Sequence, residues 1–407
     1  MKKLVLVLAL GFIGHLAIAQ NLQVQNAYNH NKSAQQYIEQ AEVLRTQNRI
    51  EKADKQMKSA KAYIQKAKEA IDASVANEQT MNDAKAWHYY GVIYYKIGIY
   101  PEFSDLDQDA FQKSLDAFSK VKTLNQKYYE DNIAEISQYI KSIGSAYYDK
   151  GANNFNESNF VDATTNFKKA YDAALIIGEQ DNSALENAAL SSMRAGDFEK
   201  SCEYYQTLLD NGYDKAGIYQ NLTIAYRNLG DNDKMLETVL KGKEKYPEDA
   251  NIINEMINTY ITLNREAEII DELIAIAEKF NTEPVYYFIL GTIYGNSESE
   301  LFNIDEAVSY YTKAIQIDPN YENAYINIGS LYIDQAAQLY NKANDLPIEM
   351  VKEYDQLISE AKSYDEKALP YVEKSYELLP DDEAIKQALK TLYNRLKMTD
   401  KAAELNK

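Results

Sequence analysis

Few side chains of this chain have the chemistry of a catalytic centre. Histidine occurs three times, and outside the N-terminal apolar stretch only His30 and His88 remain. The two are far apart in sequence, and neither has a second metal-ligand residue at helical spacing. GxSxG, HExxH and glycine-rich phosphate-binding motifs are absent from the sequence. We therefore expect no enzyme and no cofactor, and we expect His88 to lie in a groove or in solvent.

An acidic run is the one pattern that resembles a metal site. Asp105, Asp107 and Asp109 alternate along the chain, as the first three ligands of a calcium-binding loop do. However, Ala110 stands where that loop has its turn glycine, and Asp116 stands where a bidentate glutamate is expected. We expect an acidic loop in which Asp109 caps the following helix, with calcium as the alternative.

Charge and cysteine content restrict the classes of function further. Asp and Glu number 62 against 43 Lys and Arg, which gives a formal net charge of −19. Such a chain repels nucleic acid and anionic lipid surfaces. Cys202 is the only cysteine, which excludes an internal disulfide, and we expect it to be a small buried side chain. A pair of carboxylates acting as in glycosidases stays open as an alternative.

The elements that position these residues follow a repeat. Tyr219, Ile253 and Tyr287 stand 34 residues apart, and a tyrosine follows each after seven residues. Apolar or small residues also recur three and four residues after each opening residue. Offsets of 0, 3, 4 and 7 fall on one face of a helix. The pattern therefore predicts an amphipathic helix that opens each repeat.

A second helix completes each repeat. Ala307, Tyr311 and Ala314 have helical spacing, and Pro319 follows them. Gly230 marks a turn between two helices, because glycine adopts the left-handed conformation at a helix end at little cost. Since one helical pair cannot bury its own apolar face, repeats of this period predict a solenoid of stacked hairpins.

The residues of this unit resemble the tetratricopeptide repeat (TPR). The family pattern is Trp-x2-Leu-Gly-x2-Tyr followed by Ala-x3-Phe-x2-Ala-x4-Pro. Tyr287, Leu290, Gly291 and Tyr294 match its first half, and the residues from Ala307 to Pro319 match its second half after four extra residues. The resemblance implies an all-α, right-handed superhelix of about eight hairpins.

The repeat divides the chain into four regions. Residues 1–19 form a basic start, an apolar run and a small-x-small site, which is typical of a signal peptide cleaved after Ala19. Residues 20–83 are expected to form a divergent hairpin that caps the array. Residues 84–382 are expected to form the TPR array, with insertions near 97–110 and 341–363. Residues 383–407 are expected to form closing helices.

The resemblance also implies a place for a ligand. In TPR proteins, a stripe beside the packing face of each first helix lines the concave surface and contacts peptides. That stripe contains His88, Tyr148, Gln220, Arg227, Asn251, Asn254, Asn258 and Asn323. Amides suit an extended peptide, because each offers a donor and an acceptor to its backbone. Adjacent repeats lack the Lys and Arg set with which some TPR domains bind acidic chaperone tails, so we expect a neutral or basic ligand.

Together these features predict a non-catalytic scaffold or adaptor. It would be exported to the periplasm or secreted in a bacterium, and it would bind another protein or peptide without inserting into the membrane after cleavage. Two alternatives stay open. In the first, the chain would be a structural subunit of an envelope assembly or secretion complex. In the second, it would be an acidic-site ligand-binding protein or hydrolase on a TPR frame.

Overall fold

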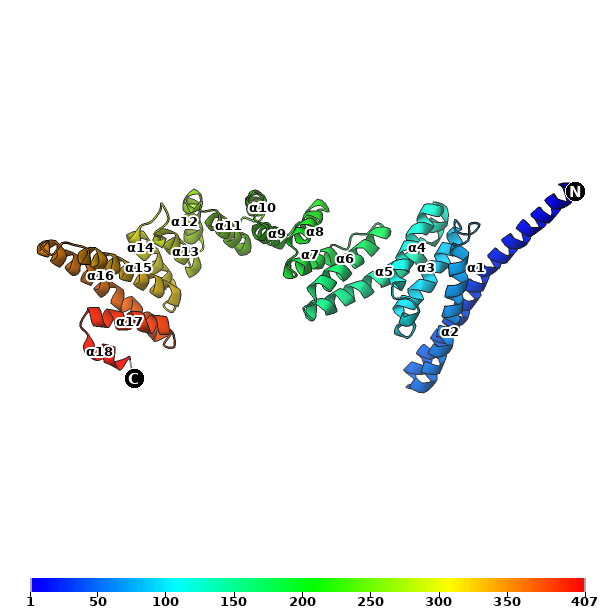
Figure 1. Cartoon of the computed structure of the whole chain (residues 1–407), viewed down its shortest axis with the longest axis horizontal. Coiled ribbons are helices and arrows are strands. Elements are labelled where there is room, and N and C mark those ends of the chain that lie inside the picture. The colour runs from blue at the N-terminus through cyan, green and yellow to red at the C-terminus, as the bar shows by residue number, and fades with distance from the viewer. Residues whose placement is uncertain (1, 406–407) are drawn as a thin grey trace. The chain divides into compact units, whose positions relative to one another are not determined.

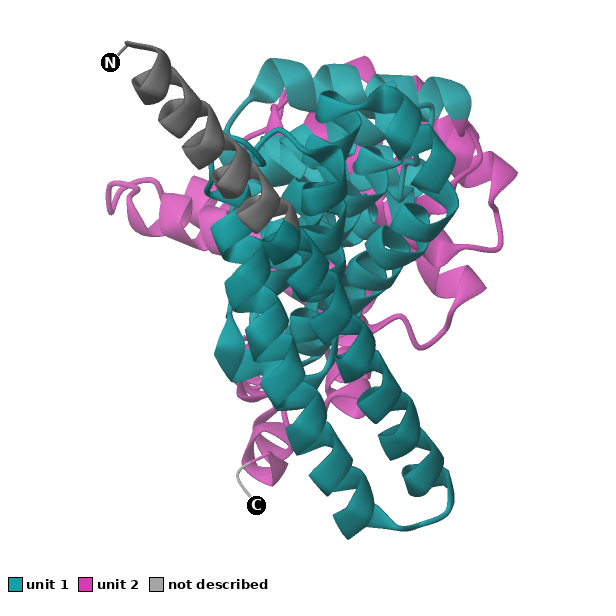
Figure 2. Cartoon of the chain, turned by 90° about the vertical axis from the view of Figure 1, so that its right-hand side faces the viewer, with its two compact units in different colours: residues 1–245 teal, residues 246–407 magenta. Residues whose placement is uncertain are grey.

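A computed structural model describes residues 22–405 of the chain, and every regular element in that range is helical. The first helix, α1 (Lys2–Thr46), is described from Leu22 onward, and residues that are not described are drawn in grey in Figure 2. The predicted signal peptide, residues 1–19, lies outside the described residues. The described residues contain no helix with the length and apolar character needed to cross a bilayer.

The chain divides into two compact units, residues 1–245 and 246–407, which are coloured separately in Figure 2. After α1, unit 1 contains α2 (Ile50–Val75), α3 (Ala84–Ile99), the short 3₁₀ helix η1 (Pro101–Leu106), α4 (Ala110–Leu124), α5 (Gln126–Asn156), α6 (Phe160–Ile176), α7 (Asn182–Arg194), α8 (Phe198–Asp210), α9 (Ala216–Leu229) and α10 (Asn232–Lys245). Unit 2 contains α11 (Ala250–Thr262), η2 (Glu266–Glu268), α12 (Ile270–Lys279), α13 (Pro284–Gly295), α14 (Ile304–Ile317), α15 (Glu322–Asn344), α16 (Val351–Leu378), α17 (Glu383–Arg395) and α18 (Thr399–Glu404).

Consecutive helices pack as hairpins along both units (Figure 1). In unit 1 the pairs are α1–α2, α3–α4, α5–α6, α7–α8 and α9–α10, and in unit 2 the pairs α13–α14 and α15–α16 are the most extensive. Each unit has its core between stacked hairpins, as in the cluster that joins Phe118, Ile140, Phe167 and Tyr205. The all-helical hairpin architecture confirms the predicted α-solenoid.

Local signals in the sequence set many helix ends. Asp83, Asp181 and Asp249 occupy N-cap positions, and their carboxylates accept hydrogen bonds from backbone amides of the first turn. Gly230 ends α9 with φ of 71°, the left-handed conformation expected of a glycine at this position. Asp109 also precedes a helix, but its side chain makes no capping hydrogen bond, so the expectation that it caps α4 is wrong.

The two expected insertions have different structures. The region near 97–110 contains η1, whose Phe103 is fully buried against the first two hairpins. In the region 341–363, α15 continues to Asn344 and α16 starts at Val351, so the insertion lengthens both helices and leaves a short connection between them. The exact limits of the predicted cap, array and closing regions stay predictions.

Candidate binding surface

The clearest exposed polar stripe lies on α11. Asn251, Asn254 and Asn258 are exposed, while residues on the opposite side, including Ile253 and Met256, are buried. Their spacing of three and four residues places the three amides on one helix face. None of the three side chains forms a hydrogen bond with another described residue. The stripe therefore offers three donors and three acceptors that the fold does not use.

The other predicted amide and arginine residues are not shown to form one binding site with this stripe. Asn323 is exposed near the start of α15, in the same unit as α11. Gln220 and Arg227 are half-buried on α9, which belongs to unit 1. The structure places all three on first helices of their repeats, as predicted, and their role in binding stays a prediction.

His88 lies in a different environment from the one predicted. Its side chain is buried, with 4% of its surface exposed, among the rings of Tyr89, Phe118 and Tyr128. Nδ1 is 3.1 Å from the Tyr128 hydroxyl, and Nε2 is 3.8 Å from a carboxylate oxygen of Glu135. Burial lowers the pKa of His88, against the opposing effect of Glu135. A groove or solvent position for His88 is therefore wrong, and its imidazole packs as a neutral ring.

The cause of this difference is the length of α5. Gly151 stands in α5 as Gly291 does in its unit, four residues after the opening residue, so the repeat pattern would open this unit at Tyr147, but α5 begins at Gln126, about 20 residues earlier. The extra turns carry Tyr128 and Glu135 over α3. They bury a position that would be exposed in a repeat of standard length.

Tyr148 takes part in packing between repeats. Its hydroxyl accepts a hydrogen bond from the amide of Asn187 at 2.8 Å, and its ring packs edge-on against Phe167. The same kind of link recurs where Asn221 donates to Tyr205 and Asn327 donates to Tyr311. These asparagines lie outside the predicted stripe. A sequence signal could have identified two of them, because Asn221 follows Tyr205 by 16 residues and Asn327 follows Tyr311 by 16 residues.

The acidic run from Asp105 to Asp109 is engaged in ion pairs. Asp105 pairs with Lys61, and Asp107 pairs with Lys113 at 2.6 Å. The backbone amide of Asp109 donates to the Asp107 side chain. Within residues 22–405, no group of three or more His, Cys, Asp or Glu side chains is arranged to hold a metal ion. The arrangement fits an acidic loop tied to its neighbours by lysines.

Close contacts between helices identify the repeat. In four units, the glycine of the first helix lies directly against a side chain of the second helix. The distances from an ideal Cβ to that side chain are 2.6 Å for Gly91–Phe118, 2.8 Å for Gly151–Phe167, 2.6 Å for Gly291–Tyr311 and 2.7 Å for Gly329–Val372. Any larger residue would push the helices apart. In the first three of these units the partner is aromatic, which is the glycine and aromatic pairing of the TPR pattern. The helix packing of these repeats resembles that of the tetratricopeptide repeat.

Comparisons with known proteins find partial similarities, among them solved structures of TPR proteins. No model of a known protein family matches the chain. The photosystem I assembly protein Ycf3 of Prochlorococcus marinus is 26% identical over 122 residues, which cover 28% of this chain and 70% of that protein. A TPR protein of Bacteroides fragilis is 18% identical, with 62% of this chain and 98% of that chain covered, at a TM-score of 0.31. A TPR protein of Thermus thermophilus is 19% identical, with 46% and 98% covered, at a TM-score of 0.32. The assignment of the repeat rests on the packing within this chain.

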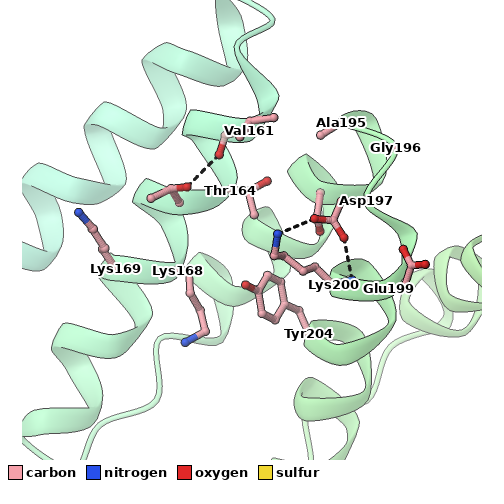
Figure 3. A pocket seen from close by; sticks show the side chains of 12 residues that line it. Val161, Thr164, Lys168, Lys169, Ala195, Gly196, Asp197, Glu199, Lys200 and Tyr204 are labelled. Carbon is pink, nitrogen blue, oxygen red and sulfur yellow. Dashed lines mark hydrogen bonds and ion pairs between the residues drawn. The ribbon is translucent and has the colours of Figure 1, made fainter.

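A pocket of about 630 Å³, which the repeat pattern does not indicate, lies between α6 and α8 (Figure 3). Its cationic groups are already engaged. Lys168 pairs with Asp172 at 2.6 Å, and Lys200 pairs with Asp197 at the N-terminus of α8. Lys169 lies over the ring of Tyr147 at 5.3 Å. Each of the three lysines that line the pocket therefore already has a partner within the fold.

Two further buried titratable side chains, Lys96 and Asp365, were not singled out by sequence reasoning. Lys96 is 7% exposed and donates to the side chain of Asn31 at 2.9 Å, and burial lowers its pKa to about 8. Asp365 is fully buried and accepts hydrogen bonds from Tyr340 at 2.9 Å and from Arg395 at 3.3 Å. Both hold helices together within their own units.

Cys202 matches its prediction. Its side chain is 8% exposed, and burial raises the pKa of the thiol to about 11. A thiol with a raised pKa is a poor nucleophile at neutral pH, because the thiolate is the reactive form. The expectation of a buried structural cysteine is confirmed.

Proposed function

We propose that this TPR array is a non-catalytic scaffold that binds another protein or peptide through the amide stripe of α11. The observation that carries the proposal is the set of unused hydrogen-bonding groups on Asn251, Asn254 and Asn258. An extended peptide exposes a backbone donor and acceptor at each residue, and side-chain amides can satisfy both. The curved face of a solenoid is the usual binding surface of such proteins.

The charge of the chain supports a choice of partner. A formal net charge of −19 repels acidic ligands at long range and favours the approach of neutral or basic ones. The amides themselves carry no charge, so the attraction would increase the rate of encounter, and hydrogen bonding would decide specificity. We propose a neutral or basic protein segment as the ligand.

The experiment compares capture of partners by three forms of the chain. The parent, from Gln20 onward, is immobilised beside the variant Asn251→Ala, Asn254→Ala, Asn258→Ala, and extract from the source cell envelope is passed over both. The matched control is Asn153→Ala with Asn156→Ala, which removes two exposed amides from α5. Replacing exposed helical Asn by Ala changes helix stability by less than about 1 kcal/mol per residue, in the favourable direction.

A partner retained by the parent and the control but lost by the triple variant supports the α11 site. Equal retention by all three places the binding site elsewhere. The captured protein is then measured against the three forms in solution, where we expect the triple variant to weaken binding at least about tenfold.

We propose further that the scaffold is exported, on the pattern of residues 1–19. Mass spectrometry of the chain expressed in a bacterial host would find a mature N-terminus at Gln20 in the periplasmic or secreted fraction. Recovery of the chain with residues 1–19 attached in the cytoplasm would contradict export.

One of the two alternatives gains support from a specific observation. The connection between α15 and α16 exposes several apolar side chains, as expected of a structural subunit that contacts another protein. The hydrolase alternative gains none, because each carboxyl group with a resolved shift among the described residues has a lowered pKa. Asp197 and Glu373 are examples, and a lysine hydrogen bond lowers the pKa of each.

A further inference from the structure

The tip of the α15–α16 hairpin exposes an unusual concentration of apolar surface. Ile348 is 88% exposed, Val351 is 60% exposed, and Met350 and Tyr354 are each 41% exposed. No other stretch of seven described residues exposes more than two large apolar side chains. The tip is the connection between α15 and α16, at the left-hand end of that hairpin in Figure 1, and it belongs to unit 2. Exposed apolar patches of this kind are typical of contact surfaces.

The same tip also carries a hollow. A cavity of about 340 Å³ is lined by residues from the end of α15, the connection and the start of α16. Leu346, Met350 and Tyr354 form part of its wall, as does the exposed Ile348. A protruding apolar side chain and the recess that it borders therefore occur on one small surface. A two-fold rotation would bring each of these features of one copy to the other feature of its partner.

Charges of both signs surround this apolar surface. Lys342 and Lys352 are exposed there, as are Asp345, Glu349 and Glu353. None of these five side chains forms an ion pair with another residue in the described part of the chain, although lysines elsewhere commonly do. A partner of a single charge sign would leave some of these groups facing like charges. A second copy would provide acids as partners for the lysines of the first copy, and lysines as partners for its acids.

We propose that the α15–α16 tip is a two-fold interface between two copies of this chain. Ile348 of one copy enters the cavity of the other, and the reverse contact forms at the same time. The mixed ring of lysines and acids forms intermolecular ion pairs around the apolar centre. A bilayer is a poorer occupant, because the three acids among the five rim charges oppose contact with anionic lipid. This inference does not depend on the peptide-binding face of α11.

The first test measures the oligomeric state by sedimentation velocity over a range of concentrations. The chain from Gln20 onward is compared with Ile348→Asp and with the double variant Ile348→Asp, Val351→Asp. The matched control is Val161→Asp, because Val161 is 70% exposed at an isolated position in unit 1. We expect the parent and the control to form dimers, and we expect the tip variants to dissociate with a constant raised about a hundredfold or more.

A second test addresses the charge ring. One variant carries Lys342→Glu and Lys352→Glu, and another carries Asp345→Lys, Glu349→Lys and Glu353→Lys. Each variant alone has a tip of one sign, so we expect each to be monomeric. An equimolar mixture restores pairs of opposite charge, so we expect the two to form a mixed dimer. Circular dichroism of every variant confirms that helicity is retained.

Three outcomes would overturn the proposal. A parent chain that stays monomeric at every concentration has no such interface. A dimer that persists unchanged in the Ile348→Asp variants uses a different surface. Flotation of the parent with zwitterionic or anionic vesicles, lost in the same variants, would assign the tip to a lipid surface.

Discussion

Two glycines in α5 allow the close helix contact of the TPR unit to be tested with an internal control. Gly144 and Gly151 lie seven residues apart in the same helix. An ideal Cβ on Gly144 meets the nearest atom, the carbonyl oxygen of Ala170, at 3.7 Å, which is ordinary contact. An ideal Cβ on Gly151 meets the Phe167 ring at 2.8–3.0 Å. The two positions thus share a backbone environment but differ in the space beside it.

The expected magnitudes follow from two opposing effects. Replacing a helical glycine by alanine stabilises the helix by about 1 kcal/mol, because glycine loses more backbone entropy on folding. Inserting a methyl group into a well-packed contact costs about 1–3 kcal/mol. Gly144→Ala should therefore stabilise α5 by up to about 1 kcal/mol. Gly151→Ala should be neutral or destabilise it by up to about 2 kcal/mol, so that the two differ by about 1–3 kcal/mol.

Hydrogen exchange measured by mass spectrometry is the suitable assay, because hairpins of a repeat array open locally. Protection of the amides in α5 and α6 reports the local free energy of opening, and about 1.4 kcal/mol corresponds to a tenfold change in protection. Amides of α1 and α2 in the same sample serve as the unaffected reference. We expect higher protection in Gly144→Ala than in the parent and lower or equal protection in Gly151→Ala.

A third variant separates the steric explanation from others. In the background Phe167→Leu, the ring that meets the new methyl group is absent, so Gly151→Ala should become stabilising, as Gly144→Ala is. Equal effects of the two alanine substitutions in the parent background would refute the reasoning. An unchanged effect of Gly151→Ala after removal of the Phe167 ring would refute it as well.

Three further predictions concern buried polar groups, each measured by urea unfolding followed by circular dichroism. Burial lowers the pKa of Lys96 from its ordinary value of 10.5 to about 8, so between these pH values the unfolded chain binds more protons than the folded chain. The free energy of unfolding of the parent should therefore rise as the pH is raised from 8 to 10.5. Lys96→Met should lack this rise and should be more stable than the parent at pH 7. Tyr311→Phe should cost about 1 kcal/mol, because Asn327 loses its hydrogen-bond acceptor, and adding Asn327→Ala should cost little more. Arg395→Met should lower the free energy of unfolding by roughly 2–4 kcal/mol, because the buried Asp365 carboxylate loses its cation. If the effects of Arg395→Met and Asp365→Leu were fully additive in the double variant, the pairing of the two residues would be contradicted.

The fold could be predicted because its determinants are local and repeated. The glycine and tyrosine positions of the Tyr287 unit recur at helical offsets, and the structure places Gly291 against Tyr311 as the pattern requires. The helix end at Gly230 and the lengthened helices beside residues 345–350 were also predicted from the sequence. Glycine at a helix end and a long polar helical stretch both have direct conformational consequences.

The environment of His88 could not be predicted, because it depends on a helix whose start the repeat pattern misplaces. Only the folded α5 brings Tyr128 and Glu135 to His88, about 40 residues away in sequence. The same limitation applies to Lys96, which is buried beside Asn31 of α1. Contacts between neighbouring hairpins whose helices differ in length have no fixed sequence period, so residues that depend on them cannot be identified from the pattern of single repeats.

The polar groups that the fold leaves unused are better indicators of function than the numerous ones that it pairs. The ring of Tyr311 packs against Gly291, and its hydroxyl accepts a hydrogen bond from Asn327. Packing within and between repeats therefore explains this side chain. Lysines over tyrosine rings, such as Lys169 over Tyr147, are explained in the same way. The amides of α11 have no such structural partner, and neither do the apolar side chains at the tip around Ile348. Exposing Ile348 to water is unfavourable, and the three asparagines lower helix propensity, so both features cost stability that folding does not require. Contact with other molecules, which we propose for both surfaces, would offset that cost.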